Sequence, residues 1–78
     1  MADYSKEVTF EIVKHIGVIS TYPTGWSKEL NRVRWNGGPA KLDIREWDEN
    51  HRYASRGTTL HDSEAKRLAL LLLEETGE

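Results

Sequence analysis

The stretch Asn36-Gly37-Gly38-Pro39 restricts the fold of this chain more than any other part of the sequence. Asn and Gly tolerate the positive φ angles that tight hairpins require, so this stretch predicts a turn. After it, residues 42–45 (LDIR) alternate apolar and charged side chains, as a strand with one buried face does. Before it, residues 28–35 (KELNRVRW) are expected to form the partner strand. The two runs predict an antiparallel hairpin in the middle of the chain.

Two more strands are predicted on either side of this hairpin. Residues 8–20 (VTFEIVKHIGVIS) read as a long strand with a bend or bulge near Gly17, because glycine inside a strand often marks one. Residues 21–26 contain a proline and a glycine and read as a loop. Residues 48–51 (DENH) read as a second polar turn, after which residues 52–60 (RYASRGTTL) are expected to pair back as a fourth strand.

A helix is predicted from His61 onward, where HDSEAKRLALLLLEETGE places acids first, strong helix formers next and Gly77 near the end. His61, Asp62 or Ser63 is the expected N-cap, and Leu60 and Ala65 could pack together at the start of the helix. The predicted fold class is therefore α+β. A four-stranded antiparallel meander is followed by one C-terminal α-helix, in a single domain spanning residues 1–78.

The leucine-rich helix predicts a homodimer. At about 100° per residue its apolar side chains cover an arc of roughly 200°, about twice the usual minimum, and one sheet cannot cover so wide an arc. A two-fold dimer is the commonest way to bury such a surface, so Leu68, Leu71 and Leu72 are the expected interface. The alternative is that Leu70 or Leu71 is simply exposed, as single apolar residues often are.

Length and composition favour a small intracellular protein. A chain of 78 residues is near the lower limit for a self-sufficient core, and without cysteine it has no disulfides or thiolate metal sites to support it. MADYSKEVTF lacks the apolar core of a signal peptide, and no stretch approaches the ~18 apolar residues of a spanning helix. We therefore expect a cytoplasmic location, with association with the nucleoid as one option, and no membrane partner.

Charge is distributed unevenly along the chain. The net charge is -2, yet residues 26–56 hold seven basic and five acidic side chains. If Leu42 and Ile44 face the core, the opposite face is exposed to solvent. That solvent face is expected to carry a tryptophan and several cations: Lys41, Arg45 and Trp47 from one strand, and Arg32 and Arg34 from its partner. Asp43 lies among them and is expected to orient Arg45 or Arg34.

Exposed aromatic rings beside cations suit single-stranded nucleic acid. Arg and Lys contact phosphates, while exposed rings stack on unpaired bases at about 1–3 kcal/mol each, and duplex DNA presents no such base faces. The alternative is structural, because cross-strand Arg, Asp and Trp pairs stabilise sheets without any ligand. His15, His51 and His61 have no metal-ligand spacing and read as strand, turn and cap residues, so neither a metal nor a cofactor is expected. No catalytic motif is present, and an enzyme is not expected.

The stretch from Gly25 to Leu73 resembles the single-stranded-DNA-binding domain of the transcriptional positive cofactor four family, especially its short bacterial branch, the YdbC proteins. Residues 35–47 (WNGGPAKLDIREW) are the most specific part, and residues 56–60 (RGTTL) before the helix are the second. The resemblance implies a homodimer formed through helices and sheet edges. It also implies two grooves that bind single-stranded DNA with little sequence preference, with RNA as a second candidate ligand.

The resemblance implies roles for particular residues. Arg34, Arg45 and Arg56 match basic positions of the family, and Lys28 stands near another. Without gaps, the family's two base-stacking aromatics align with Asn36 and Asp48, and one-residue shifts at the turns would bring in Trp35 and Trp47. Such a slip turns a side chain to the opposite face, so whether the tryptophans face ligand or core stays open. The complete set of candidate nucleic-acid-binding residues is Lys28, Arg32, Arg34, Trp35, Lys41, Arg45, Trp47, Tyr53 and Arg56.

Two limits apply to the expected function. The sequence shows none of the basic, serine-rich leader of the eukaryotic family members, so a coactivator role is not expected. A second hypothesis is a protein-interaction module, in which the same sheet face docks an acidic or aromatic partner from a transcription or replication complex.

Overall fold

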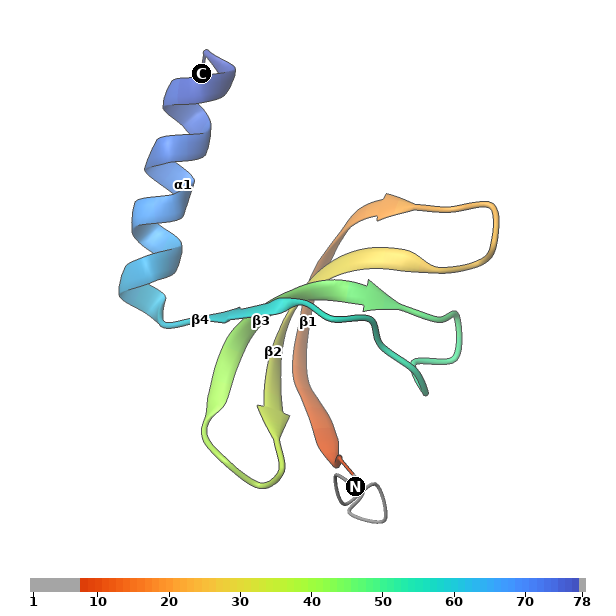
Figure 1. The fold of residues 1–78 in the computed structure, drawn as a ribbon. Helices are drawn as coiled ribbons and strands as arrows, with labels where there is room; N and C mark the ends of the chain where they lie inside the picture. The colour runs from red at the N-terminus through yellow and green to blue at the C-terminus, as the bar shows by residue number, and fades with distance from the viewer. Residues whose placement is uncertain (1–7, 78) are drawn as a thin grey trace, which may run out of the picture.

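The computed structural model describes residues 8–77 as one antiparallel sheet followed by one helix (Figure 1). The elements are β1 (Phe10–Thr21), β2 (Ser27–Trp35), β3 (Ala40–Trp47), β4 (Thr58–Leu60) and α1 (Asp62–Thr76). The strands lie in the order β1-β2-β3-β4, and each is antiparallel to the next. This confirms the predicted α+β meander with a C-terminal helix. Residues 1–7, part of the segment examined for a signal peptide, and residue 78 lie outside the described residues.

The turn between β2 and β3 has the predicted chemistry. Asn36 and Gly37 have φ angles of 52° and 73°, and the Gly38 N–H donates to the Trp35 carbonyl at 2.9 Å. Two consecutive positive φ angles define the turn type whose twist matches a two-stranded hairpin. The Asn36 side chain also accepts the Thr9 N–H at 3.0 Å, which ties the beginning of β1 to the turn.

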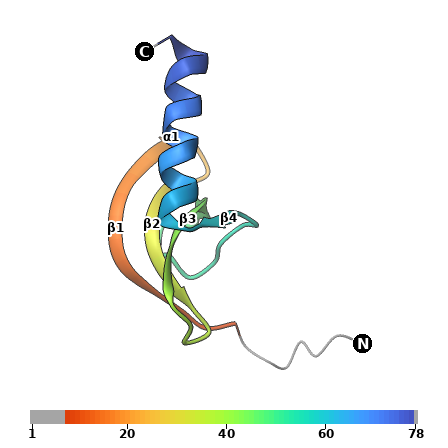
Figure 2. The same ribbon diagram turned by 90° about the vertical axis from the view of Figure 1, so that its left-hand side faces the viewer.

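Strand β1 is irregular along much of its length. Its pairing with β2 shifts register between Ile12 and Lys14, between His15 and Gly17, and between Val18 and Ser20. The bulge predicted near Gly17 is therefore present, with two further irregularities beside it. Bulges bend and twist a strand, and the sheet is strongly curved in Figure 2.

The fourth strand is much shorter than predicted. Only Thr58–Leu60 pairs with β3 as a strand, and Ala54 forms an isolated bridge with Trp47. The prediction was wrong for residues 52 and 53 because the Asp48 carboxylate accepts both of their backbone N–H groups at 2.7 Å. Those donors are consequently lost to strand pairing. Residues 48–57 instead form a loop, hereafter the β3–β4 loop, which lies on the inner side of the curved sheet (Figure 2).

Helix α1 begins and ends as its sequence predicts. The N-cap is His61, whose N–H donates to the Glu64 carboxylate at 2.7 Å. Gly77 closes the helix with a φ of 83° and donates its N–H to the Leu73 carbonyl. The helix extends away from the sheet (Figure 1), and none of its residues is buried. Within residues 8–77, no helix is both long enough and apolar enough to cross a membrane.

The two faces of the sheet differ in what covers them. Cross-strand partners share a face, so β2 and β3 can be divided by their pairing. The face beneath the β3–β4 loop is here called the inner face. Among residues 8–77, it holds all five fully or almost fully buried side chains: Glu29, Asn31, Val33, Asp43 and Trp47. The opposite face, here called the helix face, carries Leu30, Leu42 and Ile44, which are only half-buried beside α1. Most of the tight packing is therefore on the face that the sequence assigned to solvent.

Candidate nucleic-acid interface

Trp47 is completely buried, so the expectation that it faces solvent is wrong. It does share a face with Arg45, as the alternation of β3 requires, but the β3–β4 loop covers that end of the face. The centroid of its ring lies 5.0 Å from the ring centroid of Phe10 and 6.2 Å from that of Trp35. The rings of Trp47 and Trp35 are nearly parallel. The His51 ring packs 5.7 Å from that of Trp47. Trp47 is a core residue of the inner face.

Arg32 and Arg34 lie on the helix face, contrary to the expectation that they join Arg45. Their cross-strand partners are Leu42 and Ala40, so they point away from the inner face. The sequence left the register of the hairpin open, and the observed register places the odd-numbered residues of both strands together. Each arginine also pairs with an acid: Arg32 with Asp62 at 3.2 Å and Arg34 with Glu11 at 2.8 Å.

Asp43 organises the centre of the inner face. Its buried carboxylate accepts two hydrogen bonds from Arg45, at 2.7 Å from Nε and 2.6 Å from a terminal nitrogen, and one from Trp35 Nε1 at 3.1 Å. The prediction that Asp43 orients Arg45 is confirmed. The guanidinium lies over the indole of Trp35, 4.5 Å from the ring centroid. A buried charge is tolerated only when it is paired in this way, so the carboxylate fixes both the cation and the ring.

Gly57 allows the β3–β4 loop to approach Arg45. A Cβ at this position would lie 2.3 Å from both the Ile44 carbonyl oxygen and the Arg45 Cβ. No side chain fits in that space, which explains the glycine in the Arg56-Gly57-Thr58 stretch. The loop also accepts a hydrogen bond from Arg45 at the Ser55 carbonyl, at 3.3 Å. Loop and arginine are therefore held as one unit.

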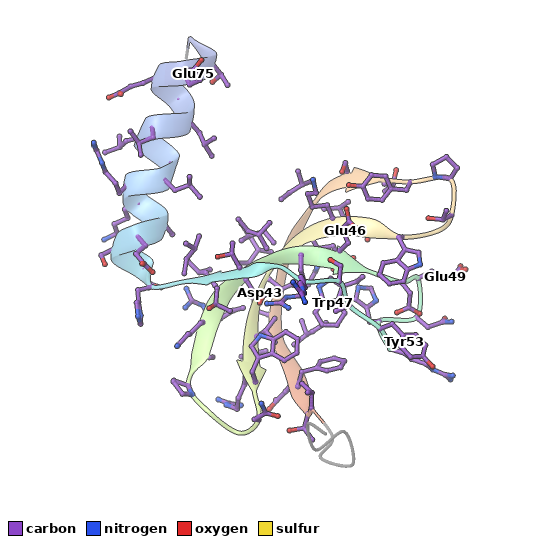
Figure 3. All side chains as sticks on the ribbon, viewed as in Figure 1. Asp43, Glu46, Trp47, Glu49, Tyr53 and Glu75 are labelled. Atoms are coloured by element: carbon purple, nitrogen blue, oxygen red, sulfur yellow. The ribbon has the colours of Figure 1, made fainter. Side chains whose placement is uncertain are left out.

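A pocket of about 310 Å³ opens between the loop and the edge of the inner face. Its lining combines aromatic rings with cations: Val8, Phe10, Trp35, Arg45, Arg52, Tyr53, Ala54 and Ser55. Tyr53 is 69% exposed and projects from the loop (Figure 3). We call this cavity the aromatic pocket. Three of the predicted binding residues line it: Trp35, Arg45 and Tyr53. Phe10 and Arg52 also line it, although the sequence gave no reason to select them.

The remaining predicted cations are dispersed. Lys41 is half-buried on the inner face opposite Val33, and Arg56 is exposed on the β3–β4 loop. Lys28 pairs with Glu46 across the strands and therefore lies on the helix face. The cationic side of the aromatic pocket consists of Arg45 and Arg52, with Lys41 on the same face of the sheet and Arg56 on the same loop.

A second polar cluster surrounds Glu29, whose side chain is almost completely buried. The carboxylate accepts hydrogen bonds from Ser27 Oγ at 2.6 Å and Asn31 Nδ2 at 3.1 Å. His51 Nε2 lies 2.9 and 3.0 Å from its two oxygens, and His15 Nδ1 lies 3.6 Å away. An ionised carboxylate only accepts hydrogen bonds, so His51 Nε2 carries the hydrogen. Sequence reasoning missed this cluster because its members come from β1, β2 and the β3–β4 loop.

Hydrogen bonding keeps Glu29 ionised. Burial raises the pKa of its carboxyl, but the hydrogen bonds from Ser27, Asn31 and His51 outweigh burial and hold that pKa below its ordinary value. The pKa of Asp48 is lowered as well, chiefly by the hydrogen bond from the Tyr53 N–H and also by that from the Arg52 N–H. Two ionised carboxylates therefore hold the loop: Asp48 through its backbone and Glu29 through His51.

The helix face contains an apolar groove between the sheet and α1. It is lined by Ile19, Leu30, Leu42, Ile44, Leu60, Ala65, Leu68, Ala69 and Leu72. Leu60 and Ala65, the two residues expected to pack at the start of the helix, both line this groove. Beyond the groove, four consecutive leucines from Leu70 to Leu73 are between 44% and 55% exposed. Residues 8–77 therefore leave much of the apolar surface of α1 uncovered.

The fold and the inner face together define a small α+β protein whose loop and sheet form an aromatic, cationic pocket. No family model matches the chain. A protein of Treponema pallidum (strain Nichols), described as uncharacterized, is 40% identical over 63 residues, which cover 81% of this chain and 74% of that protein. The chain belongs to the same family as the Treponema protein.

Proposed function

We propose that this protein binds single-stranded nucleic acid as a homodimer, with an unpaired base held in the aromatic pocket. The observation that carries the proposal is the combination of Tyr53, largely exposed on the loop, with the Arg45 guanidinium layered on Trp35. Unpaired bases stack on aromatic rings and on arginine planes. The pocket volume of about 310 Å³ is at the small end of ligand sites, which suits one base rather than a larger ligand.

The cations divide into two roles in this proposal. Arg45 is only 15% exposed and already paired with Asp43, so it serves as part of the stacking floor rather than as a phosphate ligand. Arg52 and Arg56 are exposed on the loop and contact the phosphates, with Lys41 on the sheet beside them. Because phosphate contacts release counterions, affinity falls steeply as salt is raised. Arg32 and Arg34 lie on the helix face and take no part.

Dimerisation is proposed through the helix face. The exposed leucines of α1 and the groove beside Leu68 and Leu72 form an apolar surface too wide for one short sheet to cover. A second copy would bring the same helix to this surface, in a two-fold arrangement. The inner face, with its aromatic pocket, stays open in such a dimer, so that each copy presents one pocket.

Titrating a fluorescein-labelled oligo-dT at low salt, with anisotropy as the readout, tests the nucleic-acid proposal. We expect the single strand to bind and its duplex to bind more weakly. Tyr53→Leu should weaken binding by about 1–3 kcal/mol, the usual contribution of one stacked base. Tyr22→Leu, which changes a half-buried tyrosine outside the aromatic pocket, is the matched control and should leave affinity unchanged.

Salt dependence separates stacking from phosphate contacts. Arg56→Gln should lower the slope of log affinity against log salt by roughly 0.7, whereas Tyr53→Leu should leave that slope unchanged. Absence of single-strand binding at low salt, or equal binding of single strand and duplex, would contradict the proposal. In that case the sheet face would instead be tested as a docking site for a protein.

A further inference from the structure

A second pocket lies at the tip of the β1–β2 hairpin, away from the aromatic pocket. It is an open cavity of about 500 Å³ lined by Tyr22, Thr24, Trp26 and Glu46. The loop that carries the two aromatic residues is closed by backbone hydrogen bonds, from the Tyr22 N–H to the Trp26 carbonyl at 2.8 Å and from the Gly25 N–H to the Tyr22 carbonyl at 3.0 Å. Tyr22 and Trp26 are therefore held near each other, and both are half-buried.

Glu46 supplies the charge of this pocket. Its side chain points to the side of β3 opposite Trp47 (Figure 3), and its backbone is fixed by two hydrogen bonds with Ser55, at 2.9 and 3.1 Å. Within residues 8–77, the Glu46 carboxylate has no ion-pair partner, although Lys28 is its cross-strand neighbour. A half-buried carboxylate beside two aromatic rings is thus available to a ligand.

The chemistry of the lining selects a cation. Indole and phenol rings attract a cation through the negative charge of their faces, and a carboxylate adds direct attraction. The same carboxylate repels phosphate, so a nucleic-acid backbone is disfavoured there. A single carboxylate is too few ligands for a divalent metal ion, which takes six or more oxygens in the case of calcium. An organic cation on a flexible stem fits both the rings and the charge.

We propose that this pocket binds a lysine or arginine side chain of a partner protein. The site lies on the helix face, and the aromatic pocket opens on the inner face, so the two can be occupied at once. The proposal does not depend on nucleic-acid binding. It assigns to the β1–β2 hairpin a role in recruiting a basic segment of another protein.

Short blocked peptides test the proposal directly. We would titrate the ¹⁵N-labelled protein with acetyl-Gly-Lys-Gly-amide, its arginine counterpart and its norleucine counterpart, following the Trp26 indole and the Thr24 and Glu46 amides. The two cationic peptides should shift these signals with saturation, and norleucine, which has the stem without the charge, should bind about three- to tenfold more weakly. Glu46→Gln should remove this preference, while Glu75→Gln, which changes an exposed acid near the end of α1, should retain it.

Three outcomes would overturn the proposal. Equal binding of norleucine and lysine peptides would show a purely apolar site. Saturable shifts of the same signals by oligo-dT would show a nucleobase site. A change in oligomer mass on Glu46→Gln, with peptide binding unaltered, would show that the carboxylate pairs with a cation of a second copy of this chain.

Discussion

At the scale of single residues, Asp43 decides how the inner face works. On an open surface, a carboxylate at this position would be solvated and would hold its neighbours only loosely. Here it is completely buried and holds both the Arg45 guanidinium and the Trp35 indole nitrogen. A buried acceptor with several donors fixes its partners firmly, because breaking any of these bonds leaves an unpaired charge. The ring and cation of the aromatic pocket are therefore preorganised before any ligand arrives.

The first residue-scale prediction concerns Gly57. Gly57→Ala should destabilise the protein by about 1–3 kcal/mol, since its methyl group would collide with the backbone of Ile44 and with the Cβ of Arg45. Urea denaturation measures this loss. Gly17→Ala is the matched control, because no atom lies within 4 Å of a Cβ at that site. Equal stability of the two variants would show that the loop is not tightly seated on Arg45.

A second prediction concerns how the Glu29 cluster makes the stability of the protein depend on pH in the acidic range. The folded-state pKa of Glu29 is lowered, so the unfolded chain binds more protons in acid and stability falls as pH drops from about 4.3 through that lower value. Glu29→Gln should lose about 1–3 kcal/mol at neutral pH by weakening its hydrogen bonds. The difference between wild type and variant should shrink across this acidic range.

Urea denaturation midpoints of wild type and Glu29→Gln, measured from pH 7 downward until the protein unfolds in acid, test this predicted pH dependence. Glu49→Gln changes an exposed acid by the same chemistry and should follow the wild type throughout. Asp48 also has a lowered pKa and remains in both proteins, so it cancels in the comparison. Parallel curves for wild type and Glu29→Gln would mean that Glu29 contributes nothing to acid sensitivity.

At the scale of elements, the sequence predicts most boundaries but not which face is covered. Asn36-Gly37 fixes the hairpin, and the region from His61 to Gly77 encodes both ends of α1, because these signals are local. Alternation in β3 correctly separates Leu42 and Ile44 from Asp43, Arg45 and Trp47. It cannot reveal that a loop closes over the polar side, since that depends on contacts distant in sequence, such as His51 with Glu29.

The candidate site was predicted in part for the same reason. Trp35 and Arg45 could be selected because both lie in the central hairpin. Phe10 could not, because its place beside Trp35 depends on the pairing of β1 with β2. The Asp48 side chain shortened β4 by binding the backbone of residues 52 and 53, a local competition that strand periodicity does not register.

At the scale of the whole molecule, the uncovered apolar arc of α1 predicts self-association. Analytical ultracentrifugation should give a mass of about twice the 9.0 kDa monomer, with dissociation on dilution. Leu71→Gln should weaken the dimer, because it places a polar amide in the interface. Lys66→Gln makes a similar change at an exposed polar position of the same helix and should leave the mass unchanged. A monomer at high concentration would contradict this prediction.

The irregular pairing of β1 also affects how separate molecules meet. This strand is at the edge of the sheet, is 12 residues long, and shows Val13, Ile16, Val18 and Ile19 at 43–56% exposure. A long apolar edge with regular backbone spacing would serve as a template for fibril growth. Its three register shifts interrupt the regular spacing of the outward backbone groups, so an incoming strand finds only short matching stretches. Removing these interruptions would give a chain that folds alike but polymerises more readily.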